Sequence, residues 1–230
     1  MRRMCSVVLV LVLGFALVGC QSDEETNELV VGLECNYAPF NWTTADSGDV
    51  AVEIEGVNAY CDGYDVQMAQ YIADELEMDL VIRKIEWDGL IPALLSNEID
   101  VIIAGMSPTP ERAETVSFTD EYFRSEQVLV VNTASMYANA SSLSDFNGAG
   151  VIAQMSTLQD GLIDQITGVN HQTALGDYPS LVASLTSGVS DALVAELPVA
   201  ESIIASNSGL TIVRLGEEGF TVDASDVSVS

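Results

Sequence analysis

Apolar residues recur along this chain in two alternating patterns, one typical of strands and the other of helices. Short continuous apolar runs predict buried strands, whereas apolar residues three or four positions apart predict helices. Val66, Ala69, Ile72, Ala73 and Leu76 show the helical spacing. The patterns predict strands over 29–33, 80–85, 101–104, 127–131, 151–153, 192–195 and 210–213, and helices over 66–76, 90–95, 159–166, 179–185 and 198–204. This alternation predicts α/β architecture.

The alternation restarts after about Val131, which predicts two lobes. Residues 132–144 are rich in Asn, Ser and Ala, as expected for a junction between them. The chain has 48% hydrophobic residues among 230, enough to bury a sizeable core in one or two domains.

The first residues predict export from the cytoplasm. Arg2 and Arg3 precede an apolar run over 7–18, which is too short to span a bilayer and typical of a signal-peptide core. The run ends in Leu-Val-Gly-Cys, which resembles a bacterial lipobox with Cys20 as the lipidated residue. An ordinary signal peptide with a chance cysteine is the alternative. We therefore expect a signal peptide over 1–19, a lipid-anchored tether over 20–28, and an extracytoplasmic protein attached to the cell membrane.

The charge balance excludes one class of partner. The sequence has seven Lys and Arg residues and 35 Asp and Glu residues, which gives a formal net charge of -28. Such a surface repels phosphate groups, so we expect no nucleic acid partner. The charge does not by itself predict a cationic ligand, because acids spread over a surface mostly serve solubility.

Of the four cysteines, Cys5 lies in the predicted signal peptide and Cys20 is the predicted lipid site, which leaves Cys35 and Cys61. In an oxidising compartment a disulfide between them can persist, and two reduced thiols are the equal alternative. The sequence has no Cys-x-x-Cys and no Cys/His cluster with metal-ligand spacing, so we expect no metal or other cofactor.

The segment 87–112 carries the most specific pattern. A short predicted helix and an apolar strand lead into a polar Gly-Met-Ser turn, and Thr-Pro then begins a helix with Arg112 in its first turn. Exposed backbone groups beside one fixed guanidinium suit the binding of a small carboxylate. The alternative is a surface arginine that pairs with Glu111 or Glu114.

Together with Tyr-Ala-Pro-Phe at 37–40 and Gly-Tyr-Asp-Val at 63–66, this segment closely resembles the extracellular solute-binding proteins of family 3, which serve amino-acid importers. The resemblance implies a two-lobed, type II periplasmic-binding-protein fold with a hinge of two crossing strands. It implies lobe 1 over 29–127, lobe 2 over 128–224, and the start of a return to lobe 1 over 225–230. Family members usually continue further, so we expect this chain to be C-terminally truncated.

The resemblance assigns ligand contacts to lobe 1. Arg112 matches the carboxylate-binding position, and Ser107 with the backbone of Gly105, flanking Met106, matches positions that bond the ammonium and carboxylate. The family often has serine in place of Ala104 and Gly105, so one hydroxyl is absent here.

Aromatic and acidic residues of lobe 1 match positions around the ligand side chain. Tyr37, Phe40 and Trp87 match rings that enclose it. Core packing is the alternative and is strongest for Phe40. Glu34 matches a position where an acid meets a polar or cationic ligand tail, so a polar or basic amino acid is expected.

The resemblance also assigns contacts to lobe 2. The Gln-Met-Ser-Thr-Leu-Gln segment at 154–159 resembles a family turn, with Ser156 in place of the common glycine. Thr157 and Asp160 form a capping-box-like helix start, whose free amides near Leu158 can bind a carboxylate. A plain helix cap is the alternative.

An acid that ends an apolar strand of lobe 2 completes the expected site. Glu196 occupies the position where the family usually has an ammonium-binding aspartate. Burying an acid there is costly without a cationic partner, which favours this role.

The resemblance implies the amino-acid-binding component of an ABC importer, acting as a monomer with a permease partner. An enzyme of the same fold, dehydratase-like and using Glu196 or Glu34, is one alternative, and a sensor or adhesin domain is another. His171 is the only histidine, and no nucleophile elbow, metal motif or P-loop is present. The G-x-G-x-x-A match at 148–153 precedes a predicted strand instead of following one, so it does not indicate dinucleotide binding.

Overall fold

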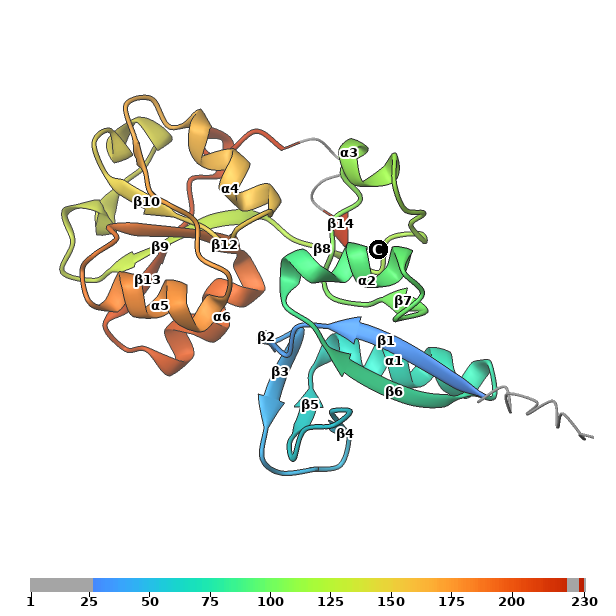
Figure 1. Ribbon diagram of the computed structural model, residues 1–230. Coiled ribbons are helices and arrows are strands. Elements are labelled where there is room, and N and C mark those ends of the chain that lie inside the picture. The colour runs from blue at the N-terminus through green and yellow to red at the C-terminus, as the bar shows by residue number, and fades with distance from the viewer. Residues whose placement is uncertain (1–26, 223–227, 230) are drawn as a thin grey trace, which may run out of the picture.

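The structure, a computed structural model, describes residues 27–222 and 228–229, and its elements form two lobes (Figure 1). The predicted signal peptide, the lipid site at Cys20 and most of the tether lie outside the described residues. Within the described ranges, no helix is both long and apolar enough to cross a bilayer.

A parallel sheet of order β6-β1-β7 forms the centre of the first lobe. Val31 in the middle strand pairs with Ile82 on one side and Val101 on the other. Helix α1 packs on β6, and α2 packs on β1 and β7, so helices cover the sheet as expected for parallel strands. The elements are β1 (Glu28–Leu33), α1 (Tyr64–Glu75), β6 (Asp79–Lys84), η1 (Trp87–Gly89), α2 (Leu90–Leu95), β7 (Val101–Ile102) and α3 (Pro110–Ala113).

A small antiparallel sheet of order β2-β3-β5-β4 extends the first lobe and corresponds to no predicted element. Its strands are short and carry Asn, Thr and Asp, so no apolar run marks them. A disulfide joins Cys35 to Cys61, whose Cα atoms lie 5.8 Å apart, and ties the loop before β2 to β5. The strands are β2 (Asn36–Tyr37), β3 (Asn41–Thr44), β4 (Val52–Glu53) and β5 (Tyr60–Asp62).

The second lobe is built on a mixed sheet of order β11-β10-β12-β9-β13. Strand β10 runs parallel to β11 and β12, whereas β9 runs antiparallel to β12 and β13. The apolar runs predict β9, β10, β12 and β13 to within about two residues. The elements are β9 (Gln127–Asn132), β10 (Gly150–Ile152), α4 (Leu158–Leu162), η4 (Ile163–Gln165), β11 (Asn170–His171), α5 (Tyr178–Thr186), β12 (Ala192–Glu196), α6 (Leu197–Ser206), β13 (Leu210–Val213) and η5 (Gly216–Glu218).

The segment 132–144, predicted as a junction, belongs to the second lobe, so that prediction is wrong. The 3-10 helix η2 (Met136–Asn139) packs on β9 and β13, and its Tyr137 stacks on the buried Phe146 of η3 (Leu143–Phe146) with ring centroids 5.3 Å apart. Small and polar residues mark turns inside a domain as well as between domains, so composition alone could not separate the two.

The chain passes between the lobes from β8 (Phe123–Arg124) to β9. In Figure 1, strand β8 lies on the side of the first lobe, away from the five-stranded sheet. Strand β14 (Ser228–Val229) pairs antiparallel with β8, so the last described residues lie on the side of the first lobe.

The disulfide generates a prediction about stability. It closes a loop with a sequence separation of 26, and constraining the unfolded chain in this way contributes roughly 3 kcal/mol. We expect Cys35→Ser/Cys61→Ser to lower the free energy of unfolding in urea by about that amount. Wild-type protein treated with reductant should unfold at the same lower urea concentration. Identical unfolding of oxidised and reduced wild type would contradict the expectation.

Candidate functional site

A small cavity lies between the lobes and has a volume of about 20 Å³. Both lobes contribute to its wall. Its lining residues are Tyr37, Trp87, Gly105, Ser107, Arg112, Gln154, Thr157, Leu158, Gln159, Tyr178 and Glu196. Such a volume holds about one or two water molecules, and hydrogen bonds from Trp87 and Arg112 to the Ser156 carbonyl join the two lobes beside it.

Arg112 connects the two walls of the cavity. Thr109 caps α3 by accepting a hydrogen bond from the Arg112 amide at 3.3 Å, and this fixes where the side chain begins. The guanidinium donates to the carbonyl of Ser107 at 2.9 Å and, across the cleft, to the carbonyl of Ser156 at 3.0 Å. It also lies 5.3 Å from the centroid of the Trp87 ring, within the range of a cation–π contact. The charge is therefore held at the cavity.

The turn after β7 is shaped by a glycine. Gly105 has φ +63°, the left-handed region that favours glycine, and a Cβ there would lie 2.9 Å from the ring of Tyr37. This close approach excludes the serine that the family often has. The Gly105 amide donates to the hydroxyl of Tyr122 at 3.2 Å, so it is engaged within the first lobe. Ser107, two residues on, lines the cavity and is buried.

Ser156 brings the second lobe close to the first. Its φ of +60° places it in the left-handed region, which explains why glycine is common at this position in the family. Its carbonyl accepts a hydrogen bond from Nε1 of Trp87 at 3.1 Å in addition to that from Arg112. One backbone oxygen thus receives two donors from the opposite lobe.

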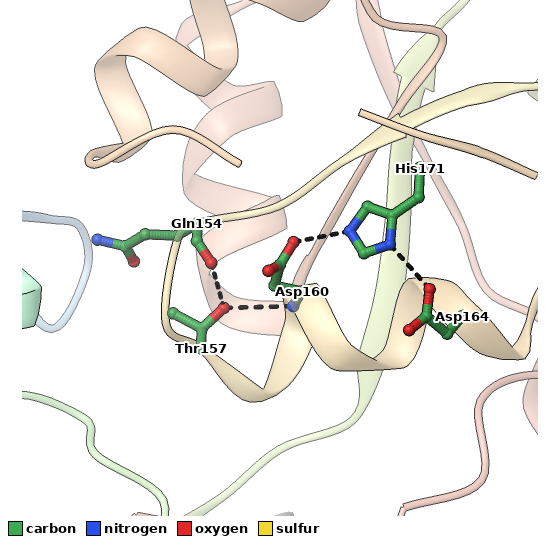
Figure 2. A network of polar contacts seen from close by, with 5 residues as sticks. All are labelled: Gln154, Thr157, Asp160, Asp164 and His171. Carbon is green, nitrogen blue, oxygen red and sulfur yellow. Dashed lines mark hydrogen bonds and ion pairs between the residues drawn. The ribbon is translucent and has the colours of Figure 1, made fainter. Parts of the chain in front are cut away.

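Thr157 starts α4 and lines the cavity (Figure 2). Its hydroxyl donates to the Gln154 carbonyl at 2.6 Å and accepts from the Asp160 amide at 3.4 Å. The predicted capping box is only half formed, because the Asp160 carboxylate contacts Nε2 of His171 at 2.9 Å. Asp164 contacts Nδ1 of the same ring at 2.9 Å.

The two acids determine the charge of His171. Burial lowers the pKa of the imidazole, but the two carboxylates outweigh this effect and raise it. In its charged form the ring donates from both nitrogens, which ties the α4 segment to β11. This anchoring fixes the helix start that faces the cavity.

Glu196 ends β12 and is only 6% exposed. Its Oε1 accepts from Nε2 of Gln159 at 2.5 Å, and the hydroxyls of Tyr37 and Tyr178 also interact with the carboxyl. Oε2 has no hydrogen bond of normal distance and angle among the described residues. Burial raises the pKa of this carboxyl, and Tyr37, Gln159 and Arg112 oppose the shift. A buried acid with one unsatisfied oxygen favours a cationic ligand group at this end of the cavity.

Glu34 is a second buried acid with an unsatisfied oxygen. It is 2% exposed, its Oε2 accepts from Nε2 of Gln154 in the other lobe at 2.8 Å, and its Oε1 has no partner among the described residues. Burial raises the pKa of Glu34 to about 7, despite the lowering effects of Gln154 and Lys84. It does not line the cavity itself, but it touches the lining residue Gln154.

The predicted aromatic residues occupy different places. Tyr37 and Trp87 line the cavity, whereas Phe40 lies in an aromatic cluster, 5.2 Å from the ring of Tyr37 and 5.1 Å from that of Phe123. Met106 is buried in the core of the first lobe and lines a neighbouring hollow with Trp87, Arg112 and Ser156, not the cavity itself. Phe40 and Met106 are therefore not among the lining residues.

Three lining residues were not among the predicted ones. Gln154 and Gln159 lie at either end of the predicted 154–159 turn, where alternate polar residues were the available signal. Tyr178, whose ring lies 5.1 Å from that of Tyr37, carries no signal beyond its position between Asp177 and a proline at a helix start. Only the pairing of the two lobes places it at the cavity.

Comparison with known proteins gives a consistent result. A family model of bacterial extracellular solute-binding proteins, family 3, matches residues 29–167. The arginine-binding extracellular protein ArtP of Bacillus subtilis is 27% identical over 220 residues, covering 91% of this chain and 79% of that protein. A probable histidine-binding protein of Campylobacter jejuni is 29% identical over 236 residues, covering 96% and 85%.

Solved structures extend the likeness to the fold. The arginine-bound form of truncated ArgBP from T. maritima has 33% sequence identity and a TM-score of 0.71, covering 81% of each chain. A Streptococcus pneumoniae amino acid ABC transporter substrate-binding protein bound to L-arginine has 27% identity and a TM-score of 0.77, covering 88% of this chain and 79% of that one. With its two lobes and the family match over 29–167, this chain has the type II periplasmic-binding-protein fold and belongs to the bacterial extracellular solute-binding proteins, family 3.

Proposed function

We propose that this protein binds a basic amino acid, with arginine as the first candidate, outside the cytoplasm and delivers it to the permease of an ABC importer. The observation that carries the proposal is a pair of buried carboxylate oxygens, one on Glu34 and one on Glu196, that have no hydrogen-bond partner within the described part of the chain. Relatives that bind arginine or histidine, by their names, support the same substrate class. Export and a lipid anchor at Cys20 complete the proposal.

The groups at the cavity match the groups of arginine. Arg112 and the backbone at the start of α4 suit the carboxylate, because a guanidinium and free amides both donate to anions. Glu196 suits the α-ammonium, and Glu34 suits the guanidinium of the ligand. Each acid would then gain the cationic partner that a buried carboxylate requires.

Binding requires the two lobes to separate and close. The cavity of about 20 Å³ is far smaller than an amino acid, so a ligand enters only when the lobes move apart. Contacts that the ligand makes with both lobes then favour the closed state over the open one. The protein acts as a monomer, since both walls come from one chain.

We propose binding without turnover, since the family consists of binding proteins. Isothermal titration calorimetry over the twenty amino acids and citrulline, followed by product analysis, tests the function directly. Saturable binding of arginine with no product supports the proposal. Chemical conversion of the ligand, or binding of acidic amino acids alone, would overturn it.

Arg112→Ala should weaken every amino acid ligand alike, because it removes the cation expected to hold the α-carboxylate. A charge-assisted hydrogen bond contributes roughly 1.5–3 kcal/mol, so we expect a loss of about tenfold to a hundredfold in affinity. Arg124→Ala is the matched control, because Arg124 is an exposed arginine that pairs with Glu121. Equal affinities for the two variants would place Arg112 outside the ligand contacts.

Glu34→Gln should weaken arginine while sparing citrulline, whose side chain has the same shape but no charge. The reason is that a desolvated guanidinium loses its ionic partner, whereas a ureido group can still bond to an amide. Glu86→Gln is the control, because Glu86 also acts electrostatically on Glu34. Equal weakening of both ligands would mean that Glu34 shapes its loop without distinguishing ligand side chains.

The raised pKa of Glu34 generates a pH prediction for binding. A cationic ligand prefers the ionised acid, and below a pKa of about 7 the ligand-free protein holds a proton there. Arginine affinity should therefore fall as the pH decreases from 8 to 6, by up to about tenfold per unit. The Glu34→Gln variant should show a weaker pH dependence over this interval when titrated in the same buffers. A pH dependence as steep as that of the wild type would assign the proton to another group.

A further inference from the structure

Asp65 is a fully buried acid that the proposed ligand contacts do not use. It is the second residue of α1, it is 0% exposed, and it is not among the residues that line the cavity. No salt bridge involving Asp65 occurs within the described residues. Burial raises its pKa to about 7. Since an apolar residue could fill this position at lower cost, the carboxylate needs an explanation from its contacts.

Both oxygens of Asp65 accept hydrogen bonds from side chains that contact backbone amides elsewhere. Oδ2 accepts from Nδ2 of Asn41 at 2.9 Å, and Oδ1 accepts from the hydroxyl of Tyr122 at 2.9 Å. Asn41 in turn accepts, through Oδ1, from the amide of Cys35 at 2.8 Å. Tyr122 accepts from the amide of Gly105 at 3.2 Å. One carboxylate is thus connected to two separate loop backbones.

Both amides belong to residues with left-handed backbone, which is strained at Cys35 and is readily adopted by glycine at Gly105. Cys35 follows Glu34 and has φ +50°, while Gly105 lines the cavity with φ +63°. Left-handed backbone persists at a non-glycine residue only when its surroundings hold it there. The hydrogen bonds from the two amides supply part of this restraint, and Asp65 orients both acceptors.

We propose that Asp65 is a positioning residue for the ligand site, acting through two separate branches. The Asn41 branch orients the loop that carries Glu34, and the Tyr122 branch orients the turn that contains Gly105. This proposal rests on the proposed arginine-binding function. The first branch governs recognition of the charged side chain of the ligand. The second branch governs the cavity wall that faces the α-carboxylate and α-ammonium groups of the ligand.

Two measurements on the mature chain test the proposal, the first of which needs no ligand. Amide hydrogen exchange by NMR should show faster exchange at Gly105 in Tyr122→Phe and at Cys35 in Asn41→Ala, by roughly tenfold. Asp65→Asn should accelerate both amides. Tyr71→Phe, on the exposed side of α1, is the matched control for loss of a hydroxyl. A general loss of stability would accelerate the exchange of all core amides together. Faster exchange at Gly105 and Cys35 alone therefore indicates that Asp65 positions these two loops.

The second measurement compares arginine with citrulline by calorimetry. Tyr122→Phe should weaken both ligands by roughly threefold to tenfold and leave their affinity ratio unchanged. Asn41→Ala should lower the ratio of arginine affinity to citrulline affinity, because it disturbs the loop that carries Glu34. The proposal would be overturned if the folded variants showed unchanged amide exchange at Gly105 and Cys35. It would also be overturned if the variants bound arginine and citrulline with the affinities, and the affinity ratio, of the wild type. If the wild type binds neither ligand, the proposed function fails, and hydrogen exchange still decides the role of Asp65.

Discussion

The burial of acids between and within the lobes is the constraint on which the rest of this structure depends. Glu34 and Glu196 lose most of their contact with water, and each keeps one oxygen that has no hydrogen-bond partner in the portion of the chain that the structure describes. Desolvating a carboxylate is costly unless a cation or several donors compensate it. The side-chain amides of Gln154 and Gln159 compensate this desolvation cost in part. The cost that remains uncompensated is the physical basis of the preference we infer for a cationic ligand.

Backbone conformation brings the compensating groups together. Gly105 and Ser156 both adopt the left-handed region, one in each lobe, and both turns contribute residues to the cavity wall. The carbonyl of Ser156 receives donors from Trp87 and Arg112, so the lobes meet through backbone as well as through side chains. Asp65 lies further back, and we propose that it orients the side chains of Asn41 and Tyr122, which accept hydrogen bonds from the amides of Cys35 and Gly105. The site therefore depends on buried polar contacts that extend well beyond the cavity wall.

Much of the fold follows from the sequence pattern. Continuous apolar runs predict β1 and β9, and regular helical spacing predicts α1, because these elements bury apolar side chains in the core. A shorter apolar run, Leu80 to Ile82, marks the less buried β6. The strands β2 to β5 escaped prediction, since they are short and polar and form only by pairing with one another. The supposed junction at 132–144 failed for a related reason, because local composition does not reveal which sheet a turn-rich segment packs against.

The candidate site divides in the same way between sequence and structure. The sequence by itself determined that Arg112 lies in the first turn of a capped helix and that Glu196 ends an apolar strand, because helix caps and apolar strand ends are local features. Only the tertiary structure decided that Tyr178 lines the cavity, that Phe40 packs away from it, and that Glu34 meets Gln154. These contacts join residues far apart in the chain, and their geometry is set by how the two lobes close on each other.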